Sequence, residues 1–287
     1  MFLVTGITGR VGGAAAQNLL AKGHKVRGLV RNPEKASAWA AQGVELVQGD
    51  FGDIAAALQG VEGAYLMMSP NMAPQHGFPE AKAIVAGYVD ALKRTPPPRL
   101  VVLSSIGSEK SERLGLITAT HLLEEGLAQF SFPIAFIRAG SFFENAIPAL
   151  GTVAQTGTFY SFYQPVDRPV PSIATRDIGA LAASLLTGPA WTGRRILELG
   201  SPCSPAQTAS AMAEVLGRPV TAQAIPRDGW TQAAESFGIP PGSTWGYEEM
   251  VDSFNSGWIE FGLPGTERVA ATTTPQQVFA AANASQS

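Results

Sequence analysis

The feature that most constrains the fold is a regular alternation of short apolar runs with helical stretches through the first 140 residues. Runs such as LVVL and IAFI predict strands buried on both faces, and such strands belong to parallel sheets. Strands that alternate with helices indicate βαβ units with right-handed crossovers. We therefore expect an α/β fold with a doubly wound parallel sheet. The apolar runs are FLVTG (2–6), KVRGLVR (25–31), VELVQGD (44–50), AYLMMS (64–69), RLVVLSS (99–105) and PIAFIRA (133–139).

Helical stretches fill the spaces between these runs, and the pattern changes after residue 139. Helices are expected over residues 11–23, 33–43, 53–60, 79–94 and 117–129. Later segments predict a helical stretch over 141–157 that breaks at Gly157, a helix over 174–188, a strand over 194–200, and helices over 204–217, 228–237 and 244–258. We expect a main domain of residues 1–150, to which 174–200 return. A smaller C-terminal α/β lobe for the substrate would comprise 151–173 and 201–287.

The stretch VTGITGRVGG (4–13) places Gly6, Gly9 and Gly12 directly after the first expected strand and at the start of the first helix. Glycines at this spacing permit a tight turn and let backbone N–H groups approach a pyrophosphate, while the helix N-terminus adds partial positive charge. The strand–loop–helix context makes a dinucleotide site the preferred interpretation.

The residue at the end of the second expected strand indicates which dinucleotide binds. NAD-binding proteins carry Asp or Glu there, which accepts a hydrogen bond from the ribose 2′-OH. This chain has Arg31 instead, and a guanidinium binds a 2′-phosphate in a bidentate way. Arg10 and Lys35 are within reach of the same phosphate in this interpretation. We therefore expect NADP(H) to be preferred over NAD(H), with a solvated Arg31 as the alternative.

Two further strand ends supply cofactor candidates. Asp50 ends the third expected strand and is placed to accept from the adenine amino group, although an Asp in GDFGD is also typical of a turn. Met67 and Ser69 end the fourth expected strand, where ligands of open α/β sheets bind.

Composition and charge exclude several classes of partner. The net charge is −3 and no block of five like charges occurs, so neither a nucleic acid nor a membrane surface is an expected partner. No run of 18 apolar residues occurs. The single cysteine, Cys203, excludes an internal disulfide and is typical of a reducing cytoplasm. The histidines show no metal-ligand spacing, so no metal is expected.

The chain resembles the NmrA-like branch of the atypical short-chain dehydrogenase/reductases, and within it the type 2 NAD(P)H:quinone oxidoreductases. The resemblance is carried in order by VTGITGRVGG, GLVRNP, GVELVQGDFGD, VVLSSIGS, HLLEE, IRAGSFFEN and ATRDIGALAASLL. It implies a Rossmann fold in which the glycine loop, with Thr8, Arg10 and Val11, and Arg31 bind NADP(H). It also implies that Ser104 faces the nicotinamide. Residues between cofactor and substrate lobe would be Phe142, Glu144 and Asn145.

The acid of ordinary short-chain dehydrogenases is missing. Those enzymes use a Tyr-x-x-x-Lys pair, in which Lys lowers the tyrosine pKa. No tyrosine here has Lys four residues later, and the last lysine is Lys110. His121 is the candidate proton donor, with Glu125 one helical turn away on the same face. The alternative is a His121–Glu125 pair that only packs. We take His121 and Ser104 as the catalytic candidates.

Hydride transfer does not require that acid when the acceptor becomes a weakly basic product, because the proton can follow from water. The protein then contributes proximity and orientation. We expect an NADPH-dependent reductase of a quinone-like or other planar conjugated acceptor, with Phe142, Phe159 and Tyr163 in the acceptor pocket. Two alternatives stay open, a non-catalytic NADP(H) sensor and a tailoring oxidoreductase or oxygenase of aromatic secondary metabolism. The oligomeric state also stays open, a homodimer included.

Overall fold

The computed structural model describes residues 1–52 and 54–284. Its centre is an eight-stranded sheet in the order β13-β10-β6-β5-β4-β1-β2-β3, and every neighbouring pair is parallel. The expected doubly wound parallel sheet is confirmed. Its strands are β1 (Phe2–Val4), β2 (Val26–Val30), β3 (Glu45–Gln48), β4 (Gly63–Leu66), β5 (Leu100–Ser105), β6 (Ile134–Ala139), β10 (Arg194–Leu199) and β13 (Glu267–Val269).

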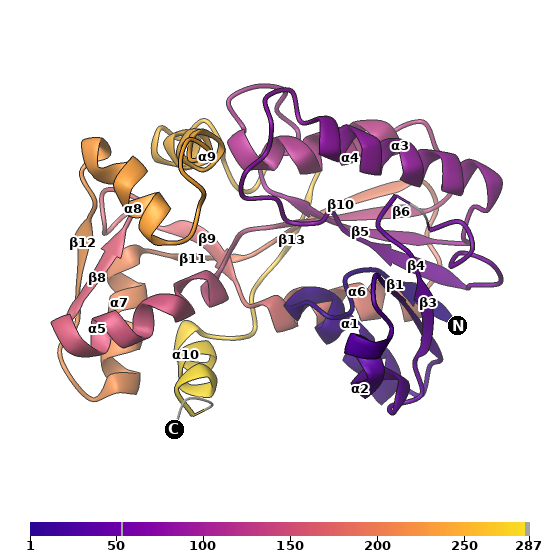
Figure 1. Cartoon of the computed structure of the whole chain (residues 1–287), viewed down its shortest axis with the longest axis horizontal. Helices are drawn as coiled ribbons and strands as arrows, with labels where there is room; N and C mark the ends of the chain where they lie inside the picture. The colour runs from indigo at the N-terminus through magenta and orange to yellow at the C-terminus, as the bar shows by residue number, and fades with distance from the viewer. Residues whose placement is uncertain (53, 285–287) are drawn as a thin grey trace.

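Helices cover both faces of this sheet. Figure 1 shows α3 (Pro79–Arg94) and α4 (Thr118–Leu127) above it, and α1 (Arg10–Ala21), α2 (Ser37–Ala40) and α6 (Thr175–Thr187) below it. Each face has its own apolar core, because the strands are buried on both sides. The strand order reverses between β1 and β4, and this switch point opens the crevice where ligands of such sheets bind.

Two expected helices take other forms. Between β3 and β4, the described residues 54–60 form turns instead of the helix expected over 53–60, and Asp53 lies outside the described residues. The stretch expected to be helical over 141–157 starts with the short strand β7 (Ser141–Phe142) and a 3-10 helix, η3 (Phe143–Ala149). Pro148 lacks an N–H, which disfavours an α-helix through this segment. Regular helix begins only with α5 (Leu150–Thr156), and Gly157 ends it at φ +69°.

The second lobe lies beside the main sheet and contains two small sheets (Figure 1). One sheet joins β7, β9 (Val170–Ile173) and β11 (Ser201–Cys203), and the other pairs β8 (Thr158–Ser161) with β12 (Thr221–Ala224). These short strands were not among the expected elements. Its helices are α5, α7 (Pro205–Leu216), α8 (Trp230–Ser236), α9 (Trp245–Asn255) and α10 (Pro275–Ala284).

One part of the expected lobe belongs to the main sheet instead. Residues 201–287 were assigned to the smaller lobe, but β13 returns and pairs with β10. The pairing is reinforced by Arg195, whose guanidinium bonds the Glu267 carboxylate at 2.7 and 2.6 Å. None of the described helices combines the length and apolar character needed to cross a membrane.

Candidate functional site

A cavity of about 890 Å³ lies at the carboxyl edge of the main sheet, at the switch point. Loops that follow β1, β2, β3 and β4 line it, together with the first turns of α4 and α6. Ten of the seventeen predicted site residues line this cavity: Gly6, Thr8, Gly9, Arg10, Val11, Arg31, Asp50, Met67, Ser69 and Phe142.

The glycine loop has the geometry that a pyrophosphate needs. Gly6 has φ +64°, and the Gly9 N–H donates to the Gly6 carbonyl at 2.9 Å. Helix α1 starts at Arg10 with no side-chain cap and no acidic residue in its first turn, so its leading N–H groups stay available to an anion. Gly12 does not line the cavity but packs against the loop from behind. A Cβ added to Gly12 would lie 2.3 Å from the backbone oxygen of Gly6.

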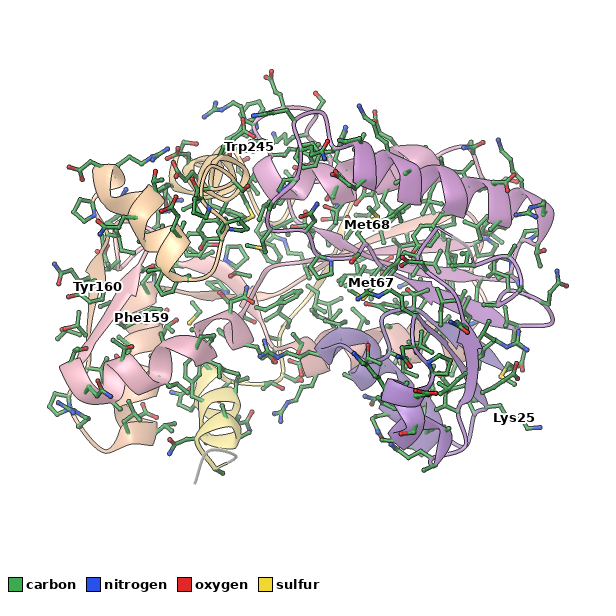
Figure 2. All side chains as sticks on the ribbon, in the orientation of Figure 1. Lys25, Met67, Met68, Phe159, Tyr160 and Trp245 are labelled. Carbon is green, nitrogen blue, oxygen red and sulfur yellow. The ribbon has the colours of Figure 1, made fainter. Side chains whose placement is uncertain are left out.

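Buried hydrogen bonds hold Met67 against this loop. The Thr5 hydroxyl contacts the Tyr65 carbonyl at 3.2 Å and accepts from the Met67 N–H at 3.1 Å. The Tyr88 hydroxyl donates to the Met67 carbonyl at 2.7 Å, and burial raises the pKa of Tyr88 far above its ordinary value, so it remains a donor. Figure 2 shows Met67 and Met68 near the middle of the molecule, beside the main sheet.

The ends of β2 and β3 place two charged groups on the cavity. Among the described residues, no ion pair or hydrogen bond engages the Arg31 guanidinium, and the side chain is exposed. One Asp50 oxygen accepts from the Phe51 N–H at 2.7 Å, which leaves the other oxygen open. Lys35, the third cation considered for this phosphate, does not line the cavity. A free arginine at this position can bind a phosphate without first breaking a contact.

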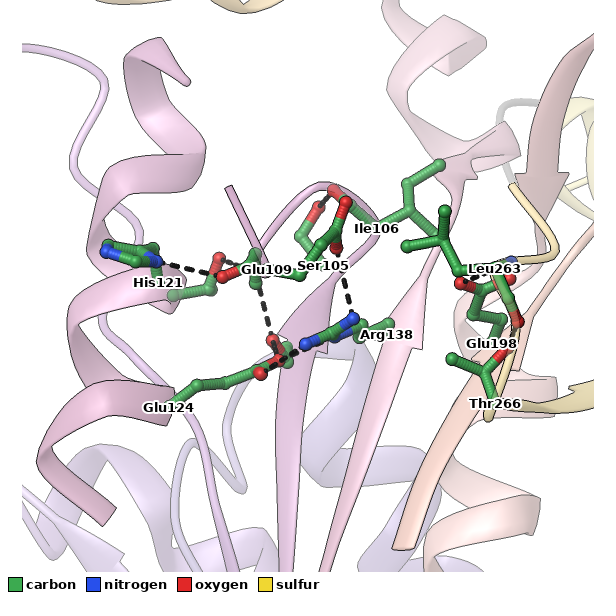
Figure 3. A network of polar contacts seen from close by, with 12 residues as sticks. Ser105, Ile106, Glu109, His121, Glu124, Arg138, Glu198, Leu263 and Thr266 are labelled. Atoms are coloured by element: carbon green, nitrogen blue, oxygen red, sulfur yellow. Dashed lines mark hydrogen bonds and ion pairs between the residues drawn. The ribbon is translucent and has the colours of Figure 1, made fainter. Parts of the chain in front are cut away.

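Behind the opposite end of the cavity lies a buried ion-pair network centred on Arg138 (Figure 3). Its guanidinium bonds both Glu124 oxygens at 2.9 and 2.7 Å, and Glu109 at 3.0 Å. Burial alone would lower the pKa of Arg138, but the bonds to Glu124 and the nearby carboxylates outweigh it and raise that pKa. Arg138 is 5% exposed, so its charge depends on these partners.

Ser104 belongs to this network and does not line the cavity. It stands beside Arg138 in the β5–β6 register, is 3% exposed, and donates to Glu124 at 2.5 Å. Its oxygen is 3.1 Å from the Ser108 hydroxyl, which is 2.8 Å from the Thr120 hydroxyl. Thr120 does line the cavity. The structure therefore separates Ser104 from the cavity by two further hydroxyl groups.

His121 also lies outside the cavity lining. Its Nδ1 is 2.9 Å from the Ser108 carbonyl, and its Nε2 is 3.4 Å from a Glu125 oxygen. The side chain is 13% exposed. This placement agrees with the alternative in which His121 and Glu125 only pack, since both ring nitrogens have protein partners.

The segment after β6 contains three predicted site residues, and they lie in different environments. Phe142 lines the cavity, Glu144 is buried behind it, and Asn145 is exposed. One Glu144 oxygen accepts from the Thr175 N–H at 2.8 Å and from its hydroxyl at 2.6 Å, at the start of α6. The other oxygen is buried without a hydrogen-bond partner among the described residues. Arg10 reaches this segment, 3.5 Å from the Glu144 carbonyl.

Two of the three aromatic residues predicted to line the acceptor pocket, Phe159 and Tyr163, lie elsewhere. Phe159 packs in the core of the smaller lobe and stands far from Met67 in Figure 2. Tyr163 packs edge-on against Phe254 at 5.8 Å, and burial raises its pKa. Both follow η3 and α5, which carry the chain away from the cavity. A second hollow of about 1340 Å³ lies in the smaller lobe beside α9, and none of the predicted site residues lines it.

Sequence reasoning missed several residues of the wall. They come from the loop after β4 and from the starts of α4 and α6, which the carboxyl-edge rule for such sheets could have indicated. That rule predicts which edge of the sheet forms the site, but it does not predict which side chains point into the site. These residues include Pro74, Phe78, Leu116, Thr120 and Thr175.

Comparison with known proteins supports one family. The chain is 31% identical over 246 residues to a (4-alkanoyl-5-oxo-2,5-dihydrofuran-3-yl)methyl phosphate reductase of Streptomyces griseus, covering 84% of this chain and 83% of that protein. It is 29% identical over 252 residues to quinone oxidoreductase 2 of Escherichia coli, covering 84% of each.

The solved structure of that Escherichia coli enzyme with NADPH is similar over almost the whole chain. The TM-score is 0.79 at 25% identity, with 98% of this chain and 99% of the other covered. The sequence model of the NmrA-like family matches residues 1–256. Together with the parallel sheet and the glycine loop at its switch point, this match shows that the chain belongs to the NmrA-like family.

Proposed function

We propose that the chain is an NADPH-dependent oxidoreductase that transfers a hydride to a quinone-like or other planar conjugated acceptor. The observation that carries the proposal is a single cavity that joins the glycine loop and Arg31 to an apolar wall. Relatives at 31% and 29% identity are a furanone phosphate reductase and a quinone oxidoreductase, which agrees with a reductase of conjugated carbonyl compounds.

The residues present fit NADPH. In this proposal the uncapped first turn of α1 binds the pyrophosphate, Arg31 binds the 2′-phosphate, and Asp50 accepts from the adenine amino group. Because Gly12 has no Cβ, the glycine loop can pack directly against the start of α1. When bound, the nicotinamide ring supplies the hydride.

The chain contributes orientation and exclusion of water. At the end of the cavity near β5, its wall is formed by apolar side chains, namely Met68, Leu103, Leu116, Ala119 and Phe142. Such a wall suits a flat acceptor packed against the nicotinamide face. The ionisable side chains that line the described cavity are Arg10, Arg31, Asp50 and Glu80. We therefore propose that water supplies the proton that follows the hydride, and that Ser104 and His121 act only through the residues they support.

The decisive experiment is NADPH oxidation with a panel of quinones, conjugated enones and an azo compound. We expect turnover with at least the quinones. Tight NADPH binding with no turnover across the panel would instead favour the non-catalytic sensor. Failure to bind NADPH would contradict the proposal at its first step.

Replacement of Arg31 tests the cofactor preference. We expect Arg31→Asp to weaken NADPH binding about 100-fold, because a charge-assisted contact is lost and a repulsive charge is added. NADH binding should stay within about threefold, since Asp can accept from the ribose 2′-OH. Dissociation constants measured by titration of both cofactors check this. Lys35→Asp is the control, because Lys35 lies outside the cavity, and an equal effect there would count against a specific role for Arg31.

Two further parts of the proposal concern the cell and the assembly. The cytoplasm is the proposed location, supported by a single cysteine, Cys203, that is buried in its reduced form. The proposed partner is a small planar molecule. The mass in solution will distinguish a monomer from a homodimer.

A further inference from the structure

Two hydroxyl groups line the cavity from the first turns of helices, and each is bonded toward a buried carboxylate. The Thr175 hydroxyl donates directly to Glu144. Thr120 is linked to Glu124 through the Ser108 and Ser104 hydroxyls. A hydroxyl has one proton, so the direction of each chain decides whether the cavity meets a donor or an acceptor.

The direction of the Thr120 chain is set at its buried end. Glu124 is held by both nitrogens of the Arg138 fork, so it is a charged acceptor. The 2.5 Å contact takes the one proton of Ser104. The Ser108 oxygen lies 3.1 Å from the Ser104 hydroxyl and 2.8 Å from the Thr120 hydroxyl, and it can accept a hydrogen bond from Thr120.

The Thr120 proton has a second inward partner as well. The Ile117 carbonyl lies 2.8 Å from the Thr120 hydroxyl, the same distance as the Ser108 oxygen. With either partner, the proton stays inside the protein. The hydroxyl therefore offers a lone pair, and not a proton, to a ligand in the cavity.

The position of Thr120 indicates which group of the bound cofactor its hydroxyl contacts. The sheet order places Arg31 at the end of β2, on one side of β1. Thr120 lies on the other side, in the first turn of α4, which packs against β5. A dinucleotide laid across the switch point with its 2′-phosphate at Arg31 brings its nicotinamide to the β5 side. The donor on the nicotinamide is the carboxamide NH2.

We propose that the Thr120 hydroxyl accepts a hydrogen bond from the nicotinamide carboxamide NH2, and that Ser108, Ser104 and Glu124 keep its proton directed inward. Thr120 thereby fixes the rotation of the nicotinamide ring and the face it turns to the acceptor. This rests on the proposed NADPH binding and adds a positioning contact to it. It also gives Ser104 a role in positioning the cofactor, although Ser104 does not line the cavity.

The test compares NADPH with its 3-acetylpyridine analogue, in which a methyl group replaces the carboxamide NH2. Dissociation constants of both are measured for the wild-type chain and for Thr120→Val, which keeps the shape and removes the hydroxyl. We expect the wild type to prefer NADPH by about fivefold to tenfold more than the variant does, as for one hydrogen bond. The ratio of the two dissociation constants is taken for each protein, and the wild-type ratio is divided by the variant ratio. This division cancels intrinsic differences between the two cofactors.

Controls separate the possible failures. Thr120→Ser should retain the preference. Thr118→Val makes the same change in the same helix at a residue outside the cavity and should also retain it. If Thr120→Val does not fold, Thr120→Ala removes the same oxygen. Equal ratios in wild type and variant would overturn this inference while leaving the proposed function intact, whereas no binding of either cofactor by the wild type would overturn the function itself.

Discussion

Gly12→Ala is expected to abolish useful cofactor binding. The added Cβ would lie 2.3 Å from the Gly6 oxygen, 2.5 Å from the Gly6 carbon and 2.7 Å from the Thr5 oxygen. All three are backbone atoms, so the loop and the start of α1 must separate. We expect a loss of about 1–3 kcal/mol in the free energy of unfolding from overpacking. NADPH affinity should fall by about 100-fold or more, since the loop would be displaced by a large part of an ångström.

Gly13→Ala is the matched control, one residue further along the same helix. Its Cβ would lie 3.2 Å from the Ile7 oxygen and 3.4 Å from the Trp39 ring, distances that small shifts can relieve. The gain in helix propensity, about 1 kcal/mol, offsets this crowding. We therefore expect NADPH affinity within about threefold of wild type. If Gly12→Ala bound NADPH as well as Gly13→Ala does, the loop would not be the pyrophosphate site.

The main sheet was predictable because its signal is local. The six apolar runs of the first half correspond to β1 through β6. The inner strands among them are buried on both faces and must be apolar, while the edge strand β3 is partly exposed. Strand β13 has no such signal. Its sequence ERV is polar and short, and it joins the sheet where the chain returns to the edge beside β10, with Glu267 bonded to Arg195. That partner lies 72 residues away in sequence.

The site was predictable where the backbone does the binding and less so where side chains do. Gly6, Gly9 and Arg31 follow from a motif whose spacing reflects the turn itself. Ser104 was placed at the correct strand end, but its direction depends on Arg138, which is brought beside it by the β5–β6 register and needs a buried partner. Thr120 gave no sequence signal, because one threonine in a helix is ordinary.

Removal of the Glu124 charge is expected to be the costliest conservative change in the described network. Glu124→Gln leaves the buried Arg138 guanidinium with Glu109 as its remaining ion-pair partner. Removing one partner of a buried pair costs about 3–5 kcal/mol, and we expect a value near 3 kcal/mol because Glu109 still neutralises the charge. Denaturant unfolding with an unchanged m-value measures this loss.

Asp90→Asn makes the matched change in an exposed pair. Arg94 and Asp90 are 2.8 Å apart, but their side chains are 61% and 68% exposed, so solvent screens them. We expect a loss of about 0.3–0.5 kcal/mol. The Arg138–Glu124 contact has nearly the same length, 2.7 Å. A difference in stability loss between the two variants would therefore come from burial of the ion pair and not from its length. Similar losses in both would mean that Glu124 is solvated in solution.

The double variant Glu124→Leu with Arg138→Met tests whether the two residues stabilise the protein only as a pair. Removing Arg138 together with Glu124 leaves no buried guanidinium without its main partner, so the loss should be smaller than that of Glu124→Leu alone by about 2 kcal/mol or more. Stability recovered in this way would show that the pair is retained for something other than stability. The hydroxyl chain through Ser104 offers that reason, because without the Glu124 carboxylate nothing directs the Ser104 proton away from the cavity. Additive losses would mean that the two residues stabilise the fold independently and that the network has no such direction.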